Sequence, residues 1–208
     1  MALIHKLVAP FSRWFRKKRM RQMQIILQLN NNDRIIDVGG YPGNWGLIDV
    51  TPNVLLVNIE DENWEQGRFK KVKGDGRSLS YADNSFDIAY SNSVIEHVGS
   101  AAEQKAFARE FRRIAKRYYI QTPYRHFPFE THLLAPFVQY LPPTVAKKTL
   151  RWITPHGWIT RAKQSWIDDF VDQTRLLTKR EMRELFPDAE HLEERIFGLT
   201  KSLIAIRR

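Results

Sequence analysis

Residues 34–43 read Arg-Ile-Ile-Asp-Val-Gly-Gly-Tyr-Pro-Gly, a short apolar run followed at once by a glycine-rich turn. Such a run predicts a buried strand, because it is short, rich in β-branched residues and bounded by turn-forming residues. A helical pattern covers 101–115. Four further runs of the strand type occur at 54–57, 69–73, 86–90 and 118–120. Strands that alternate with helices favour right-handed crossovers and a mainly parallel sheet.

The two ends of the chain extend this pattern. The serine at the start of a helix over 12–29 can act as its N-cap. Near the other end, a helix at 178–185 precedes strands at 192–196 and 202–206, and Gly198 between them predicts an antiparallel hairpin. The expected fold is therefore a doubly wound, Rossmann-like α/β domain with a mainly parallel seven-stranded sheet. An antiparallel final hairpin and a helical insertion after the fifth strand complete it.

Composition bounds the class of protein. With 43% apolar and 27% charged residues, the 208-residue chain is typical of a folded domain. The absence of cysteine excludes disulfides, iron–sulfur clusters and thiolate metal sites, and it fits a reducing compartment such as the cytoplasm. We expect neither a secretory signal nor a membrane span, because basic residues interrupt the apolar runs.

The formal charge of +10 is concentrated in two segments. Residues 1–22 and residues 131–167 carry bases without a single acid, which leaves the rest of the chain nearly neutral. The bases are Lys6, Arg13, Arg16, Lys17, Lys18, Arg19 and Arg21 in the first segment, and Lys147, Lys148, Arg151, Arg161 and Lys163 in the second.

Small or polar residues follow each of the first four expected strands. A glycine-rich turn follows the first strand, Glu60 the second, Gly-Asp-Gly at 74–76 the third, and Ser-Asn-Ser at 91–93 the fourth. In an open parallel sheet, ligands bind beyond the carboxyl ends of the strands, where backbone N–H groups are free. These loops are therefore the expected ligand site.

In this order, the loops resemble those of the class I S-adenosylmethionine-dependent methyltransferases, of the small-molecule or type 11 kind. The resemblance covers roughly 34–122. The strings that carry it are Asp37–Gly43, Gly74–Leu79 with Asp83–Ile88, and Ser91–Val98. It implies transfer of a methyl group from S-adenosylmethionine, with S-adenosylhomocysteine as the product.

The resemblance assigns roles around the first strand. Gly39, Gly40 and Gly43 would shape the turn against the methionine part of the cofactor, and Asp37 would help to hold its ammonium group. Tyr41 departs from the family pattern, since it replaces the middle glycine of the motif. A purely structural reading is open as well, in which Asp37 caps the turn and Gly39 permits a positive φ.

The resemblance assigns further roles at the next three strands. Glu60 would accept hydrogen bonds from both ribose hydroxyls, and Asn58 is the alternative ligand. Asp75 would bind the adenine amino group, with the backbone of Gly76 and Arg77 beside it. The sulfonium end would lie over two residues of the fourth loop, Ser91 and Asn92.

The domain organisation follows from these assignments. We expect one methyltransferase domain over 1–208, since the chain is short for two. Its expected segments are a basic N-terminal helix at 1–30, a cofactor-binding half at 31–123, a helical insertion or lid at 124–167, and a C-terminal helix with the closing hairpin at 168–208.

A base is needed only if the methyl acceptor must lose a proton. His132 or His126 can accept one, and Glu130 can orient either; packing of these histidines among aromatic residues is an equal alternative. Glu96 and His97 suggest a metal pair, but adjacent residues diverge on a helix. A helix-terminal or supporting role is therefore preferred for His97, and no metal site is expected.

The composition of the insertion indicates a class of substrate. Its aromatic residues and bases suit an amphipathic or anionic small-molecule or lipid acceptor. Together with the basic first helix, they can bind the surface of an anionic membrane. The protein would then be cytoplasmic and peripheral to the membrane. The alternative is a lid whose aromatic residues form a small core and whose lysines are solvated.

Rival functions differ in what they leave unexplained. A nicotinamide-dependent dehydrogenase requires Gly-x-Gly-x-x-Gly, and Tyr41 occupies the place of its second glycine. A non-catalytic, basic nucleic-acid-binding protein would explain the charge but not the order of the loops. An RNA-directed methyltransferase would explain both and stays an alternative, with nucleic acid the less favoured partner.

Overall fold

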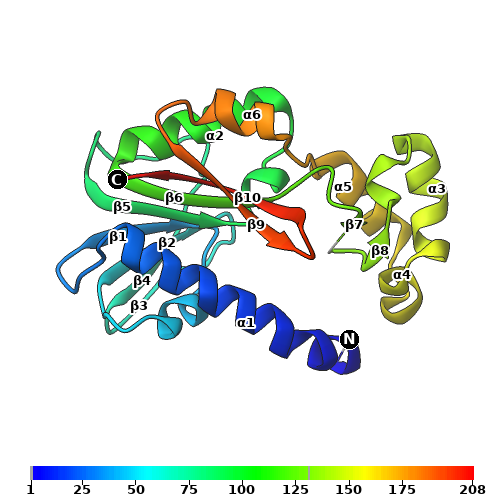
Figure 1. Ribbon diagram of the computed structural model, residues 1–208, viewed down its shortest axis with the longest axis horizontal. Coiled ribbons are helices and arrows are strands. Elements are labelled where there is room, and N and C mark those ends of the chain that lie inside the picture. Colours follow the sequence, from blue (N-terminus) through cyan, green and yellow to red (C-terminus); the bar gives the residue numbers. More distant parts are fainter. Residues whose placement is uncertain (1, 131) are drawn as a thin grey trace.

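The computed structural model describes residues 2–130 and 132–208, with side chains from residue 13 onward. Its main sheet has eight strands in the order β3-β4-β2-β1-β5-β6-β10-β9 (Figure 1). The strands are β1 (Arg34–Val38), β2 (Asn53–Asn58), β3 (Trp64–Gln66), β4 (Phe69–Lys73), β5 (Phe86–Asn92), β6 (Ala115–Pro123), β9 (Glu190–Ile196) and β10 (Leu199–Arg207). The helices that flank this sheet are α1 (Ala2–Ile26), α2 (Ala101–Ile114) and α6 (Lys179–Leu185).

The pairing confirms the expected fold. Strands β4, β2, β1, β5 and β6 are parallel, and β10 runs antiparallel to β6 and to β9. Phe197 and Gly198 both have positive φ in the tight turn of the final hairpin. The expectation of seven strands was one too few, because β3 pairs antiparallel with β4 at the sheet edge. Only three residues long, β3 is too short to show an alternating pattern.

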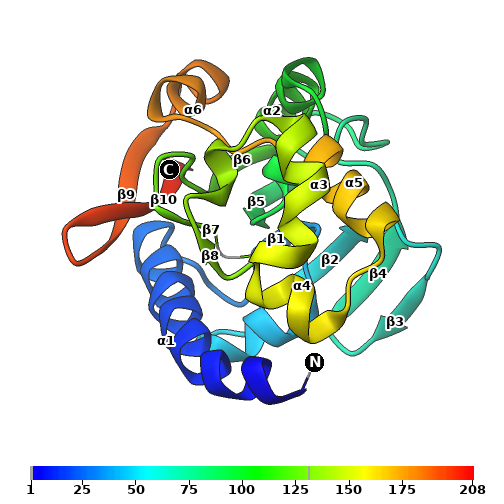
Figure 2. The same cartoon turned by 90° about the vertical axis from the view of Figure 1, so that its right-hand side faces the viewer.

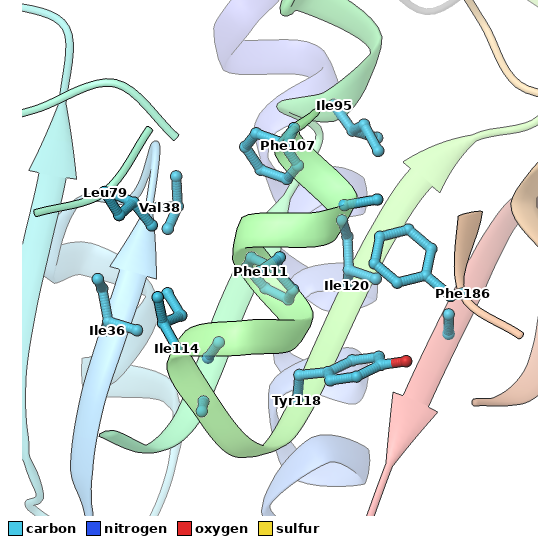
Figure 3. Close-up of a cluster of buried hydrophobic side chains, with 14 of the residues drawn as sticks. Ile36, Val38, Leu79, Ile95, Phe107, Phe111, Ile114, Tyr118, Ile120 and Phe186 are labelled. Carbon is cyan, nitrogen blue, oxygen red and sulfur yellow. The ribbon is translucent and has the colours of Figure 1, made fainter. Parts of the chain in front are cut away.

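Two apolar layers flank the sheet, because successive strand residues point to opposite faces. Ile36 packs with Phe107, Phe111 and Phe186 under α2 and α6 (Figure 3), whereas the neighbouring Ile35 packs on the side of α1. The carboxyl ends of the parallel strands are thus held at one edge between two helical layers (Figure 1).

The N-terminal helix is longer than expected. It begins at Ala2 and ends at Ile26, so Ser12 lies inside α1 and is not its N-cap. The preceding residues 2–9 contain no glycine and include strong helix formers, which extends the helix past the polar residue. The chain then leads into β1 through a turn at 27–33.

The insertion forms a separate small layer beyond the strand ends (Figure 1), and Figure 2 shows this layer facing the viewer. It contains β7 (Phe129–Glu130), β8 (Ala135–Pro136), a 3₁₀ helix η3 (Val138–Tyr140), and helices α3 (Pro143–Ile153), α4 (Pro155–Thr160) and α5 (Gln164–Gln173). The expected boundary at residue 167 falls inside α5, whose last turns bring in three acids, Asp168, Asp169 and Asp172.

The insertion's own core is aliphatic. Leu133, Leu150 and Ile167 are buried in it, whereas Trp152 and Trp158 are exposed. The alternative of an aromatic lid core is therefore wrong, because the tryptophans lie on the outer side of the helices that carry them. Throughout the described ranges, no helix is both long and apolar enough to cross a bilayer.

Candidate active site

The glycine-rich turn after β1 is closely packed. The N–H of Gly39 donates to the carbonyl of Val57 at 2.8 Å, and its φ is +78°. A Cβ atom on Gly39 would lie 2.4 Å from Cγ2 of Val94, and one on Gly40 would lie 1.8 Å from Oδ2 of Asp37. No other residue fits at either position without displacing its neighbours. Glycine here brings the backbone close to whatever occupies the strand ends.

Asp37 lies buried beneath this turn. Trp45, on the 3₁₀ helix η1 (Pro42–Leu47), donates from Nε1 to Oδ2 of Asp37 at 2.8 Å. The other carboxylate oxygen, Oδ1, has no hydrogen-bond partner in the part of the chain that the structure describes. Burial raises the pKa of Asp37 to about 7, although the bond from Trp45 lowers it. The group is thus poised to ionise when a cation approaches.

The two candidate ribose ligands at the end of β2 differ in their surroundings. Asn58 is buried and donates from Nδ2 to the carbonyl of Gly40 at 2.9 Å, so it holds the glycine turn. Glu60 is exposed and accepts from Tyr41 at 3.2 Å and from Lys71 at 3.0 Å. The bonds from Lys71 and Tyr41 hold the pKa of Glu60 below its usual value. The Tyr41 side chain is 52% exposed and reaches outward to Glu60, so it does not close the glycine turn.

Asp75 is fixed by its neighbour. The Arg77 guanidinium donates to both carboxylate oxygens, at 3.0 Å from Nε and 2.7 Å from Nη2, and the Arg77 backbone N–H donates at 2.9 Å. These bonds lower the pKa of Asp75. Gly76 lies against Val38 and Phe107, where a Cβ atom would meet them at 2.8 Å or less. The third loop is therefore pressed against the first strand.

The fourth loop is joined to the first strand and to α1. Ser91 is buried and donates to the carbonyl of Val38 at 3.0 Å. Arg19 donates from Nη1 to Oδ1 of Asn92 and to Oε1 of Gln121, the latter at 2.6 Å. Arg19 is itself buried and was missed as a site residue. Arg19 lies four residues from each of two core residues, Phe15 and Met23, and this spacing places it on the buried face of the helix.

The four loops converge at one edge of the sheet. Their strands are adjacent in the order β4-β2-β1-β5. Backbone bonds add to this, since the N–H of Gly74 donates to the carbonyl of Asn58 at 2.8 Å. The structure thus brings the loops of Gly39, Glu60, Asp75 and Ser91 to the same edge of the sheet, and their shared role in binding a cofactor stays a prediction.

A cluster of titratable residues lies beside this edge. His132 Nδ1 is 2.6 Å from Oε1 of Glu130, and its Nε2 is 3.2 Å from Nε2 of His97. Glu96 is buried on the 3₁₀ helix η2 (Ile95–His97) and accepts from Thr122 Oγ1 at 2.9 Å. Burial raises the pKa of Glu96 to about 7.

The two histidines of this cluster have opposite pKa shifts. Burial, together with the charge of His132, lowers the pKa of His97 to about 4. Burial also acts to lower the pKa of His132, but the hydrogen bond and charge of Glu130 outweigh it and leave that pKa raised. At neutral pH, His97 is therefore an uncharged imidazole.

The comparisons with known proteins agree with this arrangement. A family model described as a methyltransferase domain matches residues 44–118. The match covers 75 of the 208 residues, and over this part the chain is similar to methyltransferase domains. No curated protein matches its sequence.

Solved structures support the fold. Magnesium protoporphyrin IX methyltransferase from Synechocystis, with bound SAH, has 14% identity and a TM-score of 0.57, covering 100% of this chain and 89% of that one. A SAM-dependent methyltransferase from Methanosarcina mazei has 16% identity and a TM-score of 0.51, covering 86% and 92%. The 1,6-didemethyltoxoflavin-N1-methyltransferase from Burkholderia thailandensis, with bound 1,6-didemethyltoxoflavin and S-adenosylhomocysteine, has 14% identity and a TM-score of 0.53, covering 95% and 81%.

The remaining expected site residues lie in different places. Glu130 and His132 lie together in the cluster. His126 packs instead against the rings of Tyr124 and Tyr140, at 5.4 and 6.3 Å between centroids. Gly43 lies in η1, where a Cβ atom would meet nothing within 4 Å. The roles of these residues toward cofactor and acceptor stay predictions.

A cavity of about 420 Å³ opens between the strand ends and the insertion. Ser93 and Gln121 lie at its base, and Glu130 lines it from the insertion. Two cations, Arg19 and Lys201, lie at one side of it. Most of its remaining wall is apolar, formed by Pro123, Tyr124, Phe127, Phe129, Leu134, Leu176 and Ile196.

Proposed function

We propose that this protein is a methyltransferase that moves the methyl group of S-adenosylmethionine to an amphipathic acceptor that carries an anionic group. The cavity of about 420 Å³ is the observation that supports this acceptor. It combines a largely apolar wall with Arg19 and Lys201, and it begins beside Ser93, directly after the loop expected under the sulfonium.

The residues at the strand ends fit this cofactor. Gly39 and Gly40 form a tight turn that has no room for a Cβ atom beside Val94 and Asp37, and the unpartnered Oδ1 of Asp37 suits an ammonium group. When bound, S-adenosylmethionine supplies a methyl group on a positively charged sulfur. The residues that would hold it are Asp37, Gly39, Gly40, Glu60 with Asn58 behind it, Asp75 with the Gly76 and Arg77 backbone, and Ser91 with Asn92.

The charges beside the cavity favour an anion. Arg19 and Lys201 both lie 3.6 Å from the Glu194 carboxylate, so one negative charge faces two positive ones. Burial lowers the pKa of Lys201, which marks a lysine that lacks full hydration. A carboxylate or phosphate on the acceptor would relieve this imbalance, while an apolar body would cover Phe127 and Leu176.

Proton removal from the acceptor is proposed to occur at the Glu130–His132 pair. Glu130 lines the cavity, accepts the N–H of Leu133 at 2.6 Å, and fixes His132 through Nδ1. The Nε2 atom of His132 therefore keeps its lone pair. His126 is less suited to this role, because it packs on the outer aromatic residues.

The test is to identify which class of molecule becomes methylated. Cofactor carrying an isotopic label in its methyl group is incubated with the protein and cell extract, which is then separated into lipid, small-molecule, protein and RNA pools. We expect label in acidic lipids or acidic amphipathic small molecules. Lys201→Gln should reduce that labelling about tenfold, whereas Lys105→Gln, exposed on α2, should leave it unchanged. Label confined to the RNA or protein pool would overturn the proposed acceptor.

We further propose that the insertion docks on an anionic membrane surface. Trp152, Ile153, Trp158 and Ile159 are 44–65% exposed around the α3–α4 junction and form what we term the lid patch. Basic residues surround it, although Lys147 pairs with Asp172 at 2.7 Å and is neutralised. Exposed tryptophan beside bases suits the interface of an acidic bilayer. Flotation with vesicles tests this: binding to acidic but not to neutral vesicles is expected, and equal binding would contradict it.

A further inference from the structure

Three potential ligand atoms meet at the end of β5 from two separate parts of the chain. Glu96 and His97 come from η2, and His132 comes from the insertion. One ligand atom of each lies within 4.8 Å of the other two. The short turn of η2 places the adjacent residues 96 and 97 so that both reach the same point.

The distance between the two imidazoles suits a shared ion. Their Nε2 atoms are 3.2 Å apart. With metal–nitrogen bonds of about 2.0–2.1 Å, this separation corresponds to an N–metal–N angle of about 100°, close to tetrahedral. A hydrogen bond between the two rings would have a similar length, so the distance needs support from another observation.

That observation is the Glu96 carboxylate. The side chain is fully buried, and its Oε2 accepts from Thr122. Its Oε1 is buried without a hydrogen-bond partner among the residues that the structure describes. A buried carboxylate oxygen without a partner is costly, because it has lost its water and gained nothing. An ion held with His97 and His132 would supply the missing partner.

Each of the three side chains also has a second partner that orients it. Glu130 fixes Nδ1 of His132 at 2.6 Å, and Thr122 fixes Oε2 of Glu96. Thr174 Oγ1 lies 3.4 Å from Nδ1 of His97. Ligands in metal sites are held in this way, with a carboxylate or hydroxyl on the atom that faces away from the ion. The arrangement leaves the two Nε2 atoms facing each other, 3.2 Å apart.

We propose that Glu96, His97 and His132 bind a divalent transition-metal ion of the zinc type. Two imidazoles and one carboxylate are a ligand set typical of zinc, whereas magnesium and calcium prefer oxygen ligands. Three protein ligands leave a coordination position open, as in catalytic sites. Glu130, which fixes His132, also lines the cavity, so the cluster adjoins the proposed acceptor site.

The role of this ion rests on the proposed function, but its binding does not. In the metal-bound protein the Nε2 lone pair of His132 is bound to the ion, so the ion takes over from His132 the task of promoting proton loss. An acceptor hydroxyl at the open position would have a lowered pKa and would lose its proton to a solvent base. The oxygen then forms a bond to the methyl carbon while the methyl–sulfur bond breaks. The electron pair of that bond stays on sulfur, which leaves as the thioether of S-adenosylhomocysteine. Glu130 holds His132 in the tautomer that keeps Nε2 on the ion.

Binding of Co²⁺ and Zn²⁺ to the full chain, stripped of metal by dialysis against a chelator, tests the site. Cobalt gives visible absorption when bound by imidazole, and one Co²⁺ per chain, displaced by one Zn²⁺, is expected. His97→Gln and His132→Gln should abolish this binding. Glu130→Gln should weaken it about 10–100-fold, as loss of an orienting partner does. His126→Gln, an exposed histidine outside the cluster, is the matched control and should bind as the wild type does.

Thermal unfolding and S-adenosylhomocysteine calorimetry on each variant show whether the domain is intact. If the wild type takes up no stoichiometric Co²⁺ or Zn²⁺, the site does not exist. The same conclusion follows if folded His97→Gln and His132→Gln variants bind the ions as tightly as wild type. Stoichiometric binding combined with methyl label in the RNA pool would instead preserve the metal site and reject the proposed acceptor.

Discussion

The strand-end loops and the insertion differ in how their polar and aromatic side chains are placed. In the loops, polar groups are buried and paired within a few residues of a strand end, as Ser91 is with Val38 and Asn58 with Gly40. In the insertion, a small aliphatic core carries exposed tryptophans and bases on its outside. The buried, paired groups of the loops suit a ligand of fixed shape, such as the proposed cofactor, whereas the exposed residues of the insertion suit the proposed contact with a membrane.

This difference predicts which substitutions should weaken cofactor binding and which should not. Changes in the loops should remove cofactor binding, because the backbone and the buried Asp37 are tightly packed there. Substitutions in the insertion should leave cofactor affinity unchanged and should alter only the binding of the acceptor or of the membrane. Four predictions test this division, beginning with the largest effect.

Gly40→Ala should abolish cofactor binding. The new Cβ atom would lie 1.8 Å from Oδ2 of Asp37, so turn and carboxylate must separate. We expect a loss of about 1–3 kcal/mol in unfolding free energy, as overpacking causes. We also expect more than 100-fold weaker binding of S-adenosylhomocysteine, measured by calorimetry. Gly46→Ala is the matched control, because its Cβ atom would meet nothing within 4 Å. Tight binding by a folded Gly40→Ala variant would show that the turn does not contact the ligand.

Asp37→Asn should change the pH dependence of both stability and binding. The pKa of Asp37 is about 7 in the fold and 3.8 in the unfolded chain, so the folded state retains a proton between these values. The wild type therefore loses stability as pH rises from about 4 to 7, by about 4 kcal/mol at most. Tyr90, whose hydroxyl also lacks a partner among the described residues, is the titratable neighbour and stays neutral in this range.

The Asn variant should lack this slope, because it can accept from Trp45 but cannot ionise. Its affinity for S-adenosylhomocysteine should be flat with pH, whereas wild-type affinity should rise about tenfold between pH 6 and 8 as the carboxylate forms against the ammonium. Urea unfolding and calorimetry at a series of pH values measure the two effects. Parallel profiles for wild type and variant would remove Asp37 from the binding site.

Glu60→Ala and Asp75→Ala should each weaken S-adenosylhomocysteine binding about tenfold without unfolding the domain, as loss of a charge-assisted hydrogen bond does. Glu60 is exposed and Lys71 keeps its partner Glu62, so the fold should tolerate its loss. Glu65→Ala, on the edge strand β3, serves as the control. Wild-type affinity in both variants would mean that nucleoside recognition lies elsewhere.

Sequence reasoning reached the loops but not the contacts between distant segments. Gly39, Glu60 and Asp75 could be placed because each directly follows an apolar run, and the sheet order does the rest. Arg19 was missed because a base in a basic helix reads as a surface residue, and only the tertiary fold buries it. The contact between His97 and His132 depends on how the insertion packs against the end of β5. No local sequence pattern predicts that packing.

The lid patch should give the smallest effect. Replacing Lys148 or Arg161 by Gln should weaken binding to acidic vesicles about fivefold each, since one base near an anionic surface contributes about 1 kcal/mol. Trp158→Ser should have an effect of similar size, because an exposed indole inserts into the interface. Phe197→Ser removes a fully exposed aromatic ring from the β9–β10 turn, outside the patch, and should change nothing. Because cofactor loops and insertion are built separately, S-adenosylhomocysteine affinity should stay constant in all four variants, and a parallel loss of cofactor affinity would show that the two regions act as one.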